Sequence, residues 1–478
     1  MTVRQIVIIG AGPAGIGAAW RLNELGYEDW SLFEQEDYPG GLAASFVDEH
    51  GFTWDIGGHV QFSHYDYFDR LMDQALGDRW VHHERESWIW THGRFVPYPF
   101  QNNIRHLPAE VQWDIVLGLM RLRKRSAPLE PSSSPGGEPS GAPAANFRDW
   151  LLAMFGEGLT RHFLFPYNRK VWAWTLEAMD SRWTADRVAV VDLDRILDNI
   201  VEQRDDVGWG PNQTFRFPLR GGTGAIWRSL AAQLPQERIH YGAHVVAVDA
   251  NRRIVRFASG EEVGYEALIN TMPLDRLVDL SGIDELRPHA ARLDRNGVYV
   301  LGVGLAGEKP PHLATKCWMY FPEENCPFFR VTVFSNYSPN NVPDVKRFWS
   351  LMAEVSHSPH RPVVEPDRLA DQVIEGLKAT RLLPEQPEIV SLWQRHAPYA
   401  YPVPTLGRDE ALEAILPELE RHGIYSRGRF GAWKYEVGNQ DHSLMQGVEL
   451  VDRLLKGTAE VTLNDPNKVN AQRAGARA

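Results

Sequence analysis

The chain has 478 residues, of which 43% are apolar, so it can bury a core of several layers and is too long for one small domain. Its formal net charge of -12 offers no basic field for a nucleic acid or an anionic membrane. Two cysteines, Cys317 and Cys326, exclude a disulfide framework and lack the spacing of a zinc site. No apolar run has the form of a signal peptide or a membrane span. We therefore expect a large cytoplasmic enzyme without a metal, a nucleic acid or a membrane partner.

The first residues predict a Rossmann-type strand, turn and helix. Residues 6–9 form an apolar run typical of a buried parallel strand, and residues 14–25 have the small residues of a helix that approaches a sheet. Between them, Gly10, Gly12 and Gly15 form the pattern G-x-G-x-x-G. The first glycine permits a tight turn, the second lets the backbone approach a pyrophosphate, and the third lets helix and strand pack closely. A phosphate would then meet the helix N-terminus.

A second strand is predicted from Trp30 to Glu34. Glu34 follows the glycine turn at a spacing that lets its carboxylate accept hydrogen bonds from a ribose hydroxyl. A second glycine turn at 39–43, containing Gly41 and Leu42, is expected to run close to the cofactor diphosphate. A further glycine pair precedes a histidine at 57–59. These turns favour FAD over NAD.

The rest of the chain predicts helices, then strands, then one last helix. Apolar residues at helical spacing make 107–199 mostly helical, and the run of Ser, Pro, Gly and Ala at 125–145 is expected to be a mobile spacer. Strands are expected within 238–272 and 297–355. The last long helix is predicted at 444–455, behind a polar turn that begins at Gly438. We expect its N-terminal N–H groups to stabilise negative charge on a reduced flavin.

We therefore predict an α/β fold: an FAD-binding Rossmann-like domain with an inserted helical domain and an antiparallel β-sheet domain. The discontinuous FAD-binding domain is assigned to residues 1–84, 220–290 and 408–460. The helical domain is assigned to 105–203, with its flexible spacer at 125–145. The β-sheet substrate domain is assigned to 85–104, 204–219 and 291–407, and a C-terminal tail to 461–478.

Eight strings of residues carry a resemblance to a known family. They are GGHVQFSHYDYFD at 57–69, VPYPFQNNI at 96–104, PYNRKVWA at 166–173, GWGPNQTFRFP at 208–218, RGGTGAIW at 220–227, CWMYFPEENCPFFR at 317–330, FSNYSP at 334–339 and GRFGAWKYEVGNQDHS at 428–443. Through them the chain resembles the UDP-galactopyranose mutases, and the larger eukaryotic form more than the short bacterial one. The resemblance covers nearly the whole chain.

The resemblance implies an isomerase that interconverts UDP-galactopyranose and UDP-galactofuranose, with reduced FAD as the catalyst. In the implied mechanism, N5 of reduced FAD attacks the anomeric carbon and displaces UDP. The flavin-sugar adduct then opens and recloses through the other ring hydroxyl, and UDP returns. NADPH or NADH would supply the electrons, since Arg85 and Ser87 match positions associated with that contact, although Glu86 and Trp90 depart from the neighbouring pattern.

The resemblance also implies roles for individual residues. Arg187 and Arg330 match two catalytic arginines on the substrate diphosphate, and His59 matches a catalytic histidine beside the flavin. The expected cofactor-binding residues are Gly10, Gly12, Gly15, Glu34, Gly41, Leu42, Gly57, Gly58, His59, Arg429, Asn439 and Gln440. Residues expected on the substrate are Tyr320, Tyr401 and Tyr435 at the phosphates, Tyr98, Phe100, Gln101, Phe163 and Asn168 at the uridine, and Trp172, Asn212, Trp318 and Asn439 around the sugar.

Three alternatives stay open at this level. Trp174-Thr175 replaces a smaller residue followed by Pro in the family, so the same mechanism on another nucleotide sugar is one alternative. The second is an amine or porphyrinogen type of flavin oxidase, which shares the overall fold. The third is a flavin-bound interaction protein without catalysis. The sequence is also compatible with a homo-oligomer.

Overall fold

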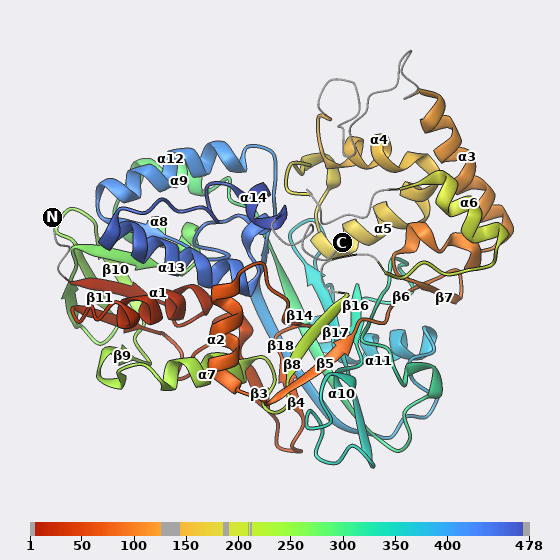
Figure 1. The fold of residues 1–478 in the computed structure, drawn as a ribbon, viewed down its shortest axis with the longest axis horizontal. Coiled ribbons are helices and arrows are strands. Elements are labelled where there is room, and N and C mark those ends of the chain that lie inside the picture. Colours follow the sequence, from red (N-terminus) through yellow and green to blue (C-terminus); the bar gives the residue numbers. More distant parts are fainter. Residues whose placement is uncertain (1–4, 126–143, 185–190, 209, 211–212, 472–478) are drawn as a thin grey trace. The chain divides into compact units, whose positions relative to one another are not determined.

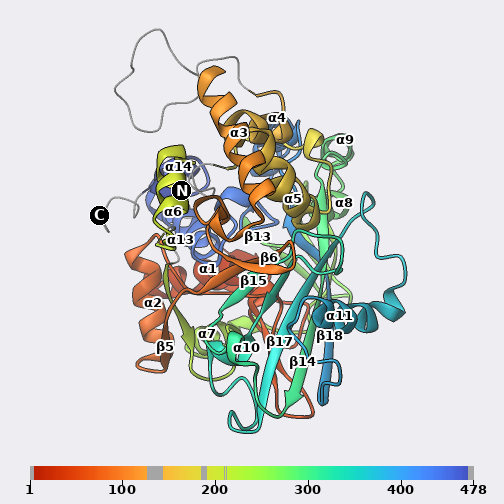
Figure 2. The same cartoon turned by 90° about the vertical axis from the view of Figure 1, so that its right-hand side faces the viewer.

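The computed structural model describes residues 5–125, 144–184, 191–208, 210 and 213–471. The chain divides into two compact units, shown in Figures 1 and 2. Unit 1 comprises 1–83, 215–297 and 397–478, and unit 2 comprises 84–214 and 298–396. Most of the predicted spacer at 125–145 lies outside the described residues. Among the described residues, no helix combines the length and the apolar character needed to cross a membrane.

Unit 1 is built on a five-stranded sheet whose pairs are all parallel. In spatial order its strands are β19 (Ile424–Ser426), β13 (Ala267–Asn270), β1 (Ile6–Ile9), β2 (Trp30–Phe33) and β9 (Ile239–His240). All four residues of β1 are buried, because helices cover both faces of the sheet. This arrangement confirms the predicted Rossmann-like α/β fold.

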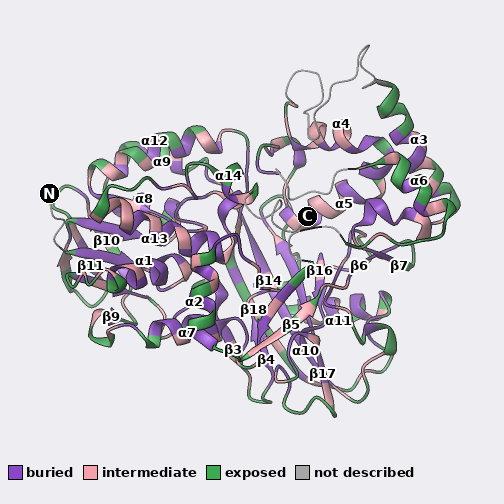
Figure 3. Cartoon of the chain, in the orientation of Figure 1, coloured by how far each residue is buried: buried purple, intermediate pink, exposed green. Residues whose placement is uncertain are grey.

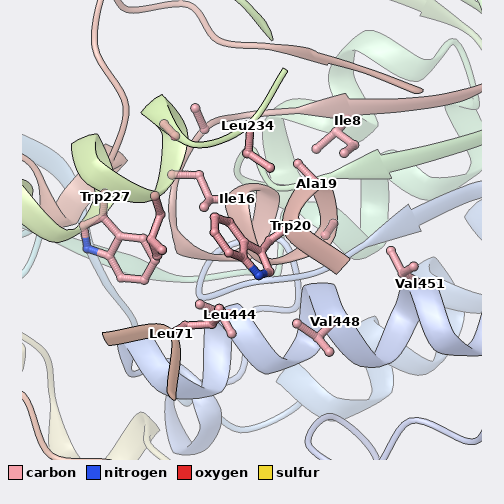
Figure 4. Close-up of a cluster of buried hydrophobic side chains, with 14 of the residues drawn as sticks. Ile8, Ile16, Ala19, Trp20, Leu71, Trp227, Leu234, Leu444, Val448 and Val451 are labelled. Atoms are coloured by element: carbon pink, nitrogen blue, oxygen red, sulfur yellow. The ribbon is translucent and has the colours of Figure 1, made fainter. Parts of the chain in front are cut away.

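Alternate residues of β1 enter two separate cores. Ile6 and Ile8 join the core formed with α1 (Pro13–Glu24), α2 (Asp66–Leu76), α7 (Gly224–Ala232) and α13 (Gln440–Lys456). Figure 4 shows the side chains of this core, with Leu444 and Val448 of α13 facing Trp20 of α1. Val7 and Ile9 join the other core, formed with α8 (Leu274–Ser281), α9 (Arg287–Ala290) and α12 (Arg408–Arg421). The period of two along a strand thus divides one apolar run between two layers.

Helix α13 begins at Gln440, four residues before the predicted start at 444. Asn439 is the extended residue that precedes it, with φ -69° and ψ 168°. The polar residues Asp441 and His442 suggested a turn, but both are buried in the first helical turn. Because the contacts that bury them come from distant parts of the chain, the prediction placed the boundary wrongly.

Smaller sheets complete unit 1. The hairpin strands are β3 (Ser45–Val47) and β4 (Thr53–Asp55), and the three-stranded antiparallel sheet contains β10 (Val245–Asp249), β11 (Ile254–Phe257) and β12 (Glu262–Gly264). Strand β5 (Trp80–Glu84) pairs with β8 (Thr214–Pro218). The short helix α14 (Pro466–Ala471) lies within the predicted C-terminal tail.

Unit 2 is built on a seven-stranded sheet, whose central strands are largely buried in Figure 3. In spatial order its strands are β18 (Ile389–Pro402), β14 (Arg295–Ala306), β17 (Phe348–His357), β16 (Arg330–Thr332), β15 (Trp318–Tyr320), β6 (Ser87–Thr91) and β7 (Arg94–Pro97). The predicted antiparallel sheet needs one correction, because β15 and β6 pair in parallel. These strands are distant in the sequence, so no hairpin turn imposes the antiparallel direction.

The helices of unit 2 lie mainly between β7 and β8 in the sequence. They are α3 (Ala109–Arg125), α4 (Phe147–Leu159), α5 (Phe165–Trp172) and α6 (Leu193–Val201), with α10 (Phe334–Tyr337) and α11 (Leu369–Ala379) following later. Helices α3 and α4 pack closely through glycines, because a Cβ atom on Gly158 would lie 2.4 Å from the carbonyl oxygen of Asp114. The close pair is visible in Figure 2. The mostly helical character predicted for 107–199 is confirmed for its described residues.

Asp55, at the end of β4, is an acid whose side chain has no exposed surface. Its carboxylate accepts hydrogen bonds from Ser45 Oγ at 2.5 Å and from Thr223 Oγ1 at 2.8 Å. Burial raises the pKa of Asp55 to about 6, because desolvation outweighs these bonds and the attraction of Arg228.

We expect Asp55 to make unit 1 less stable as the pH rises through 6. The folded pKa exceeds the ordinary value of 3.8, so the stabilising contribution is complete below pH 3.8 and is lost as the pH rises through the folded value. The full difference is about 3 kcal/mol at 1.36 kcal/mol per pKa unit. Urea unfolding of the wild type and of Asp55→Asn at a series of pH values measures it. Equal pH dependence in the two proteins would contradict the assignment.

Candidate functional site

The glycine turn after β1 forms a cradle in which the three glycines have different surroundings. A Cβ atom on Gly15 would lie 1.9 Å from the carbonyl oxygen of Gly10, so Gly15 lets α1 pack against the strand. Gly10 has φ +98°, which a side chain rarely tolerates. A Cβ on Gly12 would meet no atom within 4 Å. The backbone at Gly12 therefore faces open space at the N-terminus of α1, as a pyrophosphate-binding turn requires.

The second predicted glycine turn lies directly against the first. The N–H of Gly40 donates to the carbonyl oxygen of Ala11 at 2.8 Å. At Gly41, the position of an added Cβ lies 3.5 Å from the Cα of Gly12. Leu42 belongs to the 3-10 turn η1 (Gly41–Ala43) and packs partly buried against the core around β1. The structure thus brings both turns together, although Ala11 and Gly40 lie 29 positions apart in the sequence.

Glu34 lies at the carboxyl end of β2, beside this cradle. Its Oε2 accepts a hydrogen bond from the N–H of Ala11 at 2.6 Å, and its Oε1 accepts one from the N–H of Glu36 at 3.0 Å. Burial raises the pKa of Glu34, whereas the two backbone N–H donors oppose that rise. The carboxylate is therefore held in a fixed orientation at the position where the Rossmann pattern places a ribose acceptor.

These features fit an adenine dinucleotide such as FAD. The open backbone at Gly12 can admit a diphosphate, α1 directs its N-terminus to the same place, and the carboxylate of Glu34 lies at the adjacent strand end. When FAD is bound, Gly10, Gly12, Gly15, Glu34 and Gly41 would hold its adenosine diphosphate half.

Five other predicted cofactor residues lie on two segments: Gly57, Gly58 and His59 on the loop after β4, and Asn439 and Gln440 at the start of α13. Gly57 has φ +92°, and His59 follows on this loop. Gln440 Oε1 accepts hydrogen bonds from Trp227 Nε1 at 3.0 Å and from Gln61 Nε2 at 3.3 Å. Gln440 therefore connects the first turn of α13 to α7 and to the His59 loop.

A buried pair, His64 and Asp441, fixes the loop after β4 to the start of α13. The sequence did not predict this pair. The backbone N–H of His64 donates to Asp441 Oδ2 at 3.0 Å, and His64 Nδ1 lies 2.7 Å from the same oxygen. The ring of His64 stacks on His442 with centroids 4.7 Å apart. The nearby histidines keep the pKa of Asp441 well below its usual range despite burial. The signal was present in two of the matching strings, 57–69 and 428–443, which together contain all three residues.

His64, Asp441 and His442 are also the group in the described part of the chain whose ligand atoms are close enough for a metal ion. Their arrangement favours a hydrogen-bonded pair, because Asp441 Oδ2 already takes both donors of His64 and the two imidazole rings stack face to face. A structural metal would require the ring nitrogens to converge on one point. We assign this cluster to positioning the loop that carries His59.

Three further predicted residues of unit 1 lie together near the N-terminus of α13. Arg429 Nε donates to the carbonyl oxygen of Gly438 at 2.7 Å, and its Nη1 donates to that of Ala400 at 3.1 Å. The guanidinium lies 5.5 Å from the ring centre of Tyr401, whose ring is 5.9 Å from that of Tyr435. Arg429 thus connects Gly438, just before the start of α13, to the end of β18, where Tyr401 lies.

In unit 2, strand register places the predicted phosphate-binding residues side by side. Tyr320 of β15 pairs with Arg330 of β16, and Arg330 pairs with Glu354 of β17. Directly opposed residues project from the same face of a sheet, so the three side chains form one row. Arg330 Nε and Nη2 donate to the carboxylate of Glu354 at 2.7 and 2.8 Å. This pair fixes the orientation of the guanidinium.

The pair with Glu354 modifies the predicted role of Arg330. A two-point contact with phosphate through the Nε–Nη2 edge is excluded while Glu354 holds that edge. A phosphate would have to approach the other side of the guanidinium. Glu354, with a side chain 3% exposed, was missed because nothing in the sequence aligns it with Arg330.

The three aromatic residues predicted at the uridine lie in a row of rings in unit 2, which Tyr167 and Tyr320 complete. Phe100 stacks on Phe163, Phe163 stacks on Tyr167, and Tyr167 meets the edge of Tyr320, with centroids 4.5, 5.3 and 5.2 Å apart. Tyr98 continues the row at 5.8 Å from Tyr320. Tyr167 is the link that the sequence reasoning missed, although it precedes Asn168 in a matching string. Phe100 and Phe163 stack on each other, so their own faces are partly occupied.

Other predicted substrate residues are more buried than a ligand contact requires. Trp172 is 2% exposed and meets the edge of Trp183 at 5.0 Å, and Trp318 is 5% exposed. Gln101 lies buried in the 3-10 turn η2 (Phe100–Asn102). Asn168 Nδ2 donates to the carbonyl oxygen of Leu164 at 2.8 Å, within its own helical segment. Their substrate contacts stay predictions.

Arg85 and Ser87, the two residues predicted to contact the nicotinamide dinucleotide, lie in different environments. The guanidinium of Arg85 lies 4.8 Å from the ring centre of Tyr98, whereas Ser87 is buried in β6 opposite Trp318. Two substrate predictions, Arg187 and Asn212, lie outside the described residues.

Comparison with known proteins first defines the class. The model of flavin containing amine oxidoreductases matches residues 13–428, which makes this chain a flavoprotein of that class. A solved putrescine oxidase structure has a TM-score of 0.63 at 16% identity, covering 94% of this chain and 98% of that one, and shows the shared fold. A zeta-carotene desaturase of Zea mays is 39% identical over 74 residues. That match spans 16% of this chain and 13% of the relative, so the chain matches about an eighth of the length of such curated relatives.

A solved structure of a reduced UDP-galactopyranose mutase is far more similar. It shares 48% sequence identity and a TM-score of 0.92 over 98% of both chains. The chain belongs to the UDP-galactopyranose mutase family, as its strings of residues predicted. Its assignment to the larger eukaryotic form stays a prediction.

Proposed function

We propose that this protein interconverts UDP-galactopyranose and UDP-galactofuranose as a reduced-flavin-dependent isomerase. The observation that supports this activity best is the 48% identity to a UDP-galactopyranose mutase across 98% of both chains, against 16% to a putrescine oxidase with the same fold. Since that match covers 98% of both chains, the likeness extends beyond the FAD-binding sheet of unit 1.

We assign the substrate diphosphate to the row formed by Tyr320 and Arg330. The guanidinium, held by Glu354, would supply a fixed positive charge to UDP as it departs and returns. The phenol of Tyr320 lies beside it on the same sheet face and can donate to a phosphate oxygen. Arg187, Tyr401 and Tyr435 are proposed as further phosphate contacts.

The uridine is assigned to the aromatic row of Tyr98, Phe163 and Tyr167, with Gln101 and Asn168 as polar contacts. Trp172, Asn212, Trp318 and Asn439 are proposed around the sugar. His59, Gly58 and Arg429 are proposed on the flavin side. Bound reduced FAD would supply an electron-rich N5 that bonds transiently to the anomeric carbon, and NADPH or NADH would supply its electrons.

The residues at the start of α13 would then serve the flavin electrostatically. The first N–H groups of a helix carry partial positive charge, which favours an anionic reduced ring. The buried pair of His64 and Asp441 would keep this helix end and the His59 loop in register. Arg429 fixes the residue before the helix through the carbonyl oxygen of Gly438.

Turnover of UDP-galactofuranose tests the proposal directly. The purified flavoprotein, reduced with dithionite, is expected to convert UDP-galactofuranose to UDP-galactopyranose, separated by chromatography, whereas the oxidised protein is expected to be inactive. Other UDP-hexoses are the controls for sugar selectivity. If the reduced protein leaves UDP-galactofuranose unchanged while the oxidised protein consumes oxygen with an amine or a porphyrinogen, the proposed function is wrong and an oxidase replaces it.

A further inference from the structure

Lys170 is a buried amine whose hydrogen-bond partners among the described residues are two carbonyl oxygens and one thiol. It lies on α5 and is 1% exposed. Its Nζ donates to the carbonyl oxygens of Phe321 at 3.0 Å and Glu323 at 2.5 Å, and it lies 3.4 Å from Cys326 Sγ. The carboxylate of Glu324, which is nearby in the sequence, binds Arg361 through both oxygens instead. Burial lowers the pKa of Lys170, which increases its neutral, nucleophilic fraction.

Cys326, whose Sγ lies beside the amine of Lys170, is also buried. It is 4% exposed, and its Sγ lies 3.6 Å from the carbonyl oxygen of Phe328. Helix α11 covers it closely, since a Cβ atom on Gly376 would lie 2.9 Å from the Cβ of Cys326. Burial raises the pKa of Cys326, whereas the nearby Lys170 opposes that rise. In its deprotonated form, each of the two atoms has a lone pair that can attack an oxygen atom of peroxide.

We propose that Cys326 and Lys170 are an oxidative modification site, at which hydrogen peroxide joins Sγ and Nζ through one bridging oxygen atom. The 3.4 Å separation favours a bridge over a direct bond, because a single S–N bond would require the two segments to approach much further. Both groups are enclosed, so the small, uncharged peroxide can reach them more readily than glutathione or another protein thiol. A buried Cys without a second thiol cannot form a disulfide.

The proposed steps balance in atoms and electrons. Peroxide oxidises the thiol by two electrons to a sulfenic acid and releases water. A second peroxide oxidises the amine by two electrons to a hydroxylamine and releases another water. The hydroxylamine oxygen then attacks the sulfenic sulfur, an S–O bond forms, and the sulfenic hydroxyl leaves with a proton as a third water. Reduced flavins produce hydrogen peroxide when they react with dioxygen, so the cofactor class of this family supplies the oxidant.

The site connects two segments that carry predicted substrate residues. Lys170 lies between Asn168 and Trp172 on α5, and Cys326 lies between Tyr320 and Arg330 on the connection from β15 to β16. A covalent bridge would hold these segments at one separation. Peroxide formed at the flavin would thus fix the part of unit 2 that we assign to the nucleotide.

Mass spectrometry of the full-length flavoprotein tests the proposal without any activity assay. Protein kept reduced with dithiothreitol and then treated with graded hydrogen peroxide is expected to gain one oxygen and lose two hydrogens, about 14 Da. Proteolysis and tandem spectra should find the peptides of Lys170 and Cys326 joined. Excess dithiothreitol should restore the original mass, and Cys326→Ser should not show the gain.

Cys317 is the matched control within the same molecule. It is 3% exposed, its pKa is raised to about 11, and Sγ contacts the backbone of Glu86 and Glu84. Cys317→Ser is therefore expected to form the bridge like the wild type. An unchanged mass, oxygen added to Cys326 without joining Lys170, or an equal gain in Cys326→Ser would each overturn the proposal. None of these results depends on whether the protein isomerises UDP-galactose.

Discussion

Arg330→Ala is expected to remove measurable UDP binding and to lower turnover by roughly 10²–10³-fold, the usual effect of removing one donor to a developing negative charge. The physical reason is the position of Arg330 between Tyr320 and Glu354 on one sheet face. Calorimetric titration of UDP and the rate with UDP-galactofuranose measure the two effects.

The same substitution leaves the buried carboxylate of Glu354 without its partner, which destabilises a protein by about 3–5 kcal/mol. The double variant Arg330→Met with Glu354→Gln removes that charge and separates folding from binding. Arg361→Met is the matched control, because Arg361 also binds a carboxylate through two nitrogens in unit 2 but lies on an exposed pair. If the double variant is folded, retains flavin and binds UDP like the wild type, Arg330 does not hold the phosphate.

Gly12→Ala is expected to abolish flavin binding while leaving the fold intact. Its φ of -76° suits alanine, and a Cβ there would meet no protein atom within 4 Å. The new methyl group would occupy the space into which a diphosphate must fit. Visible flavin absorbance after purification measures the loss, and the circular dichroism and thermal midpoint of the flavin-free protein measure folding.

Gly15→Ala is the informative counterpart three residues further on. Its Cβ would lie 1.9 Å from the carbonyl oxygen of Gly10, so α1 and β1 would have to separate. Overpacking of this kind destabilises by about 1–3 kcal/mol or more. Compared with the flavin-free wild type, we therefore expect a lower thermal midpoint for Gly15→Ala and an unchanged one for Gly12→Ala. Full flavin content in Gly12→Ala would contradict the assignment of the cradle.

Local patterns were sufficient for the strand, turn and helix at the start of the chain. The apolar run at 6–9 and the glycine spacing predict one structure, because a tight turn at Gly10, an open backbone at Gly12 and close helix packing at Gly15 are the requirements of a dinucleotide-binding turn. The pattern did not give the start of α13, because Asp441 and His442 are polar residues whose burial depends on contacts from the loop that ends at His64. Nor did it give the parallel direction of β15 and β6, since period-two alternation contains no information about strand direction.

The sequence by itself determined the class of fold, the dinucleotide cradle and the family, because these depend on backbone requirements and on long strings of unchanged side chains. Only the tertiary structure decided that Tyr320, Arg330 and Glu354 share a sheet face, that Tyr167 joins the aromatic row and that Lys170 meets Cys326. Strand register and helix packing bring residues together over more than a hundred positions of sequence, as from Lys170 to Cys326. No local pattern encodes such a pairing, because it depends on how all the intervening elements pack.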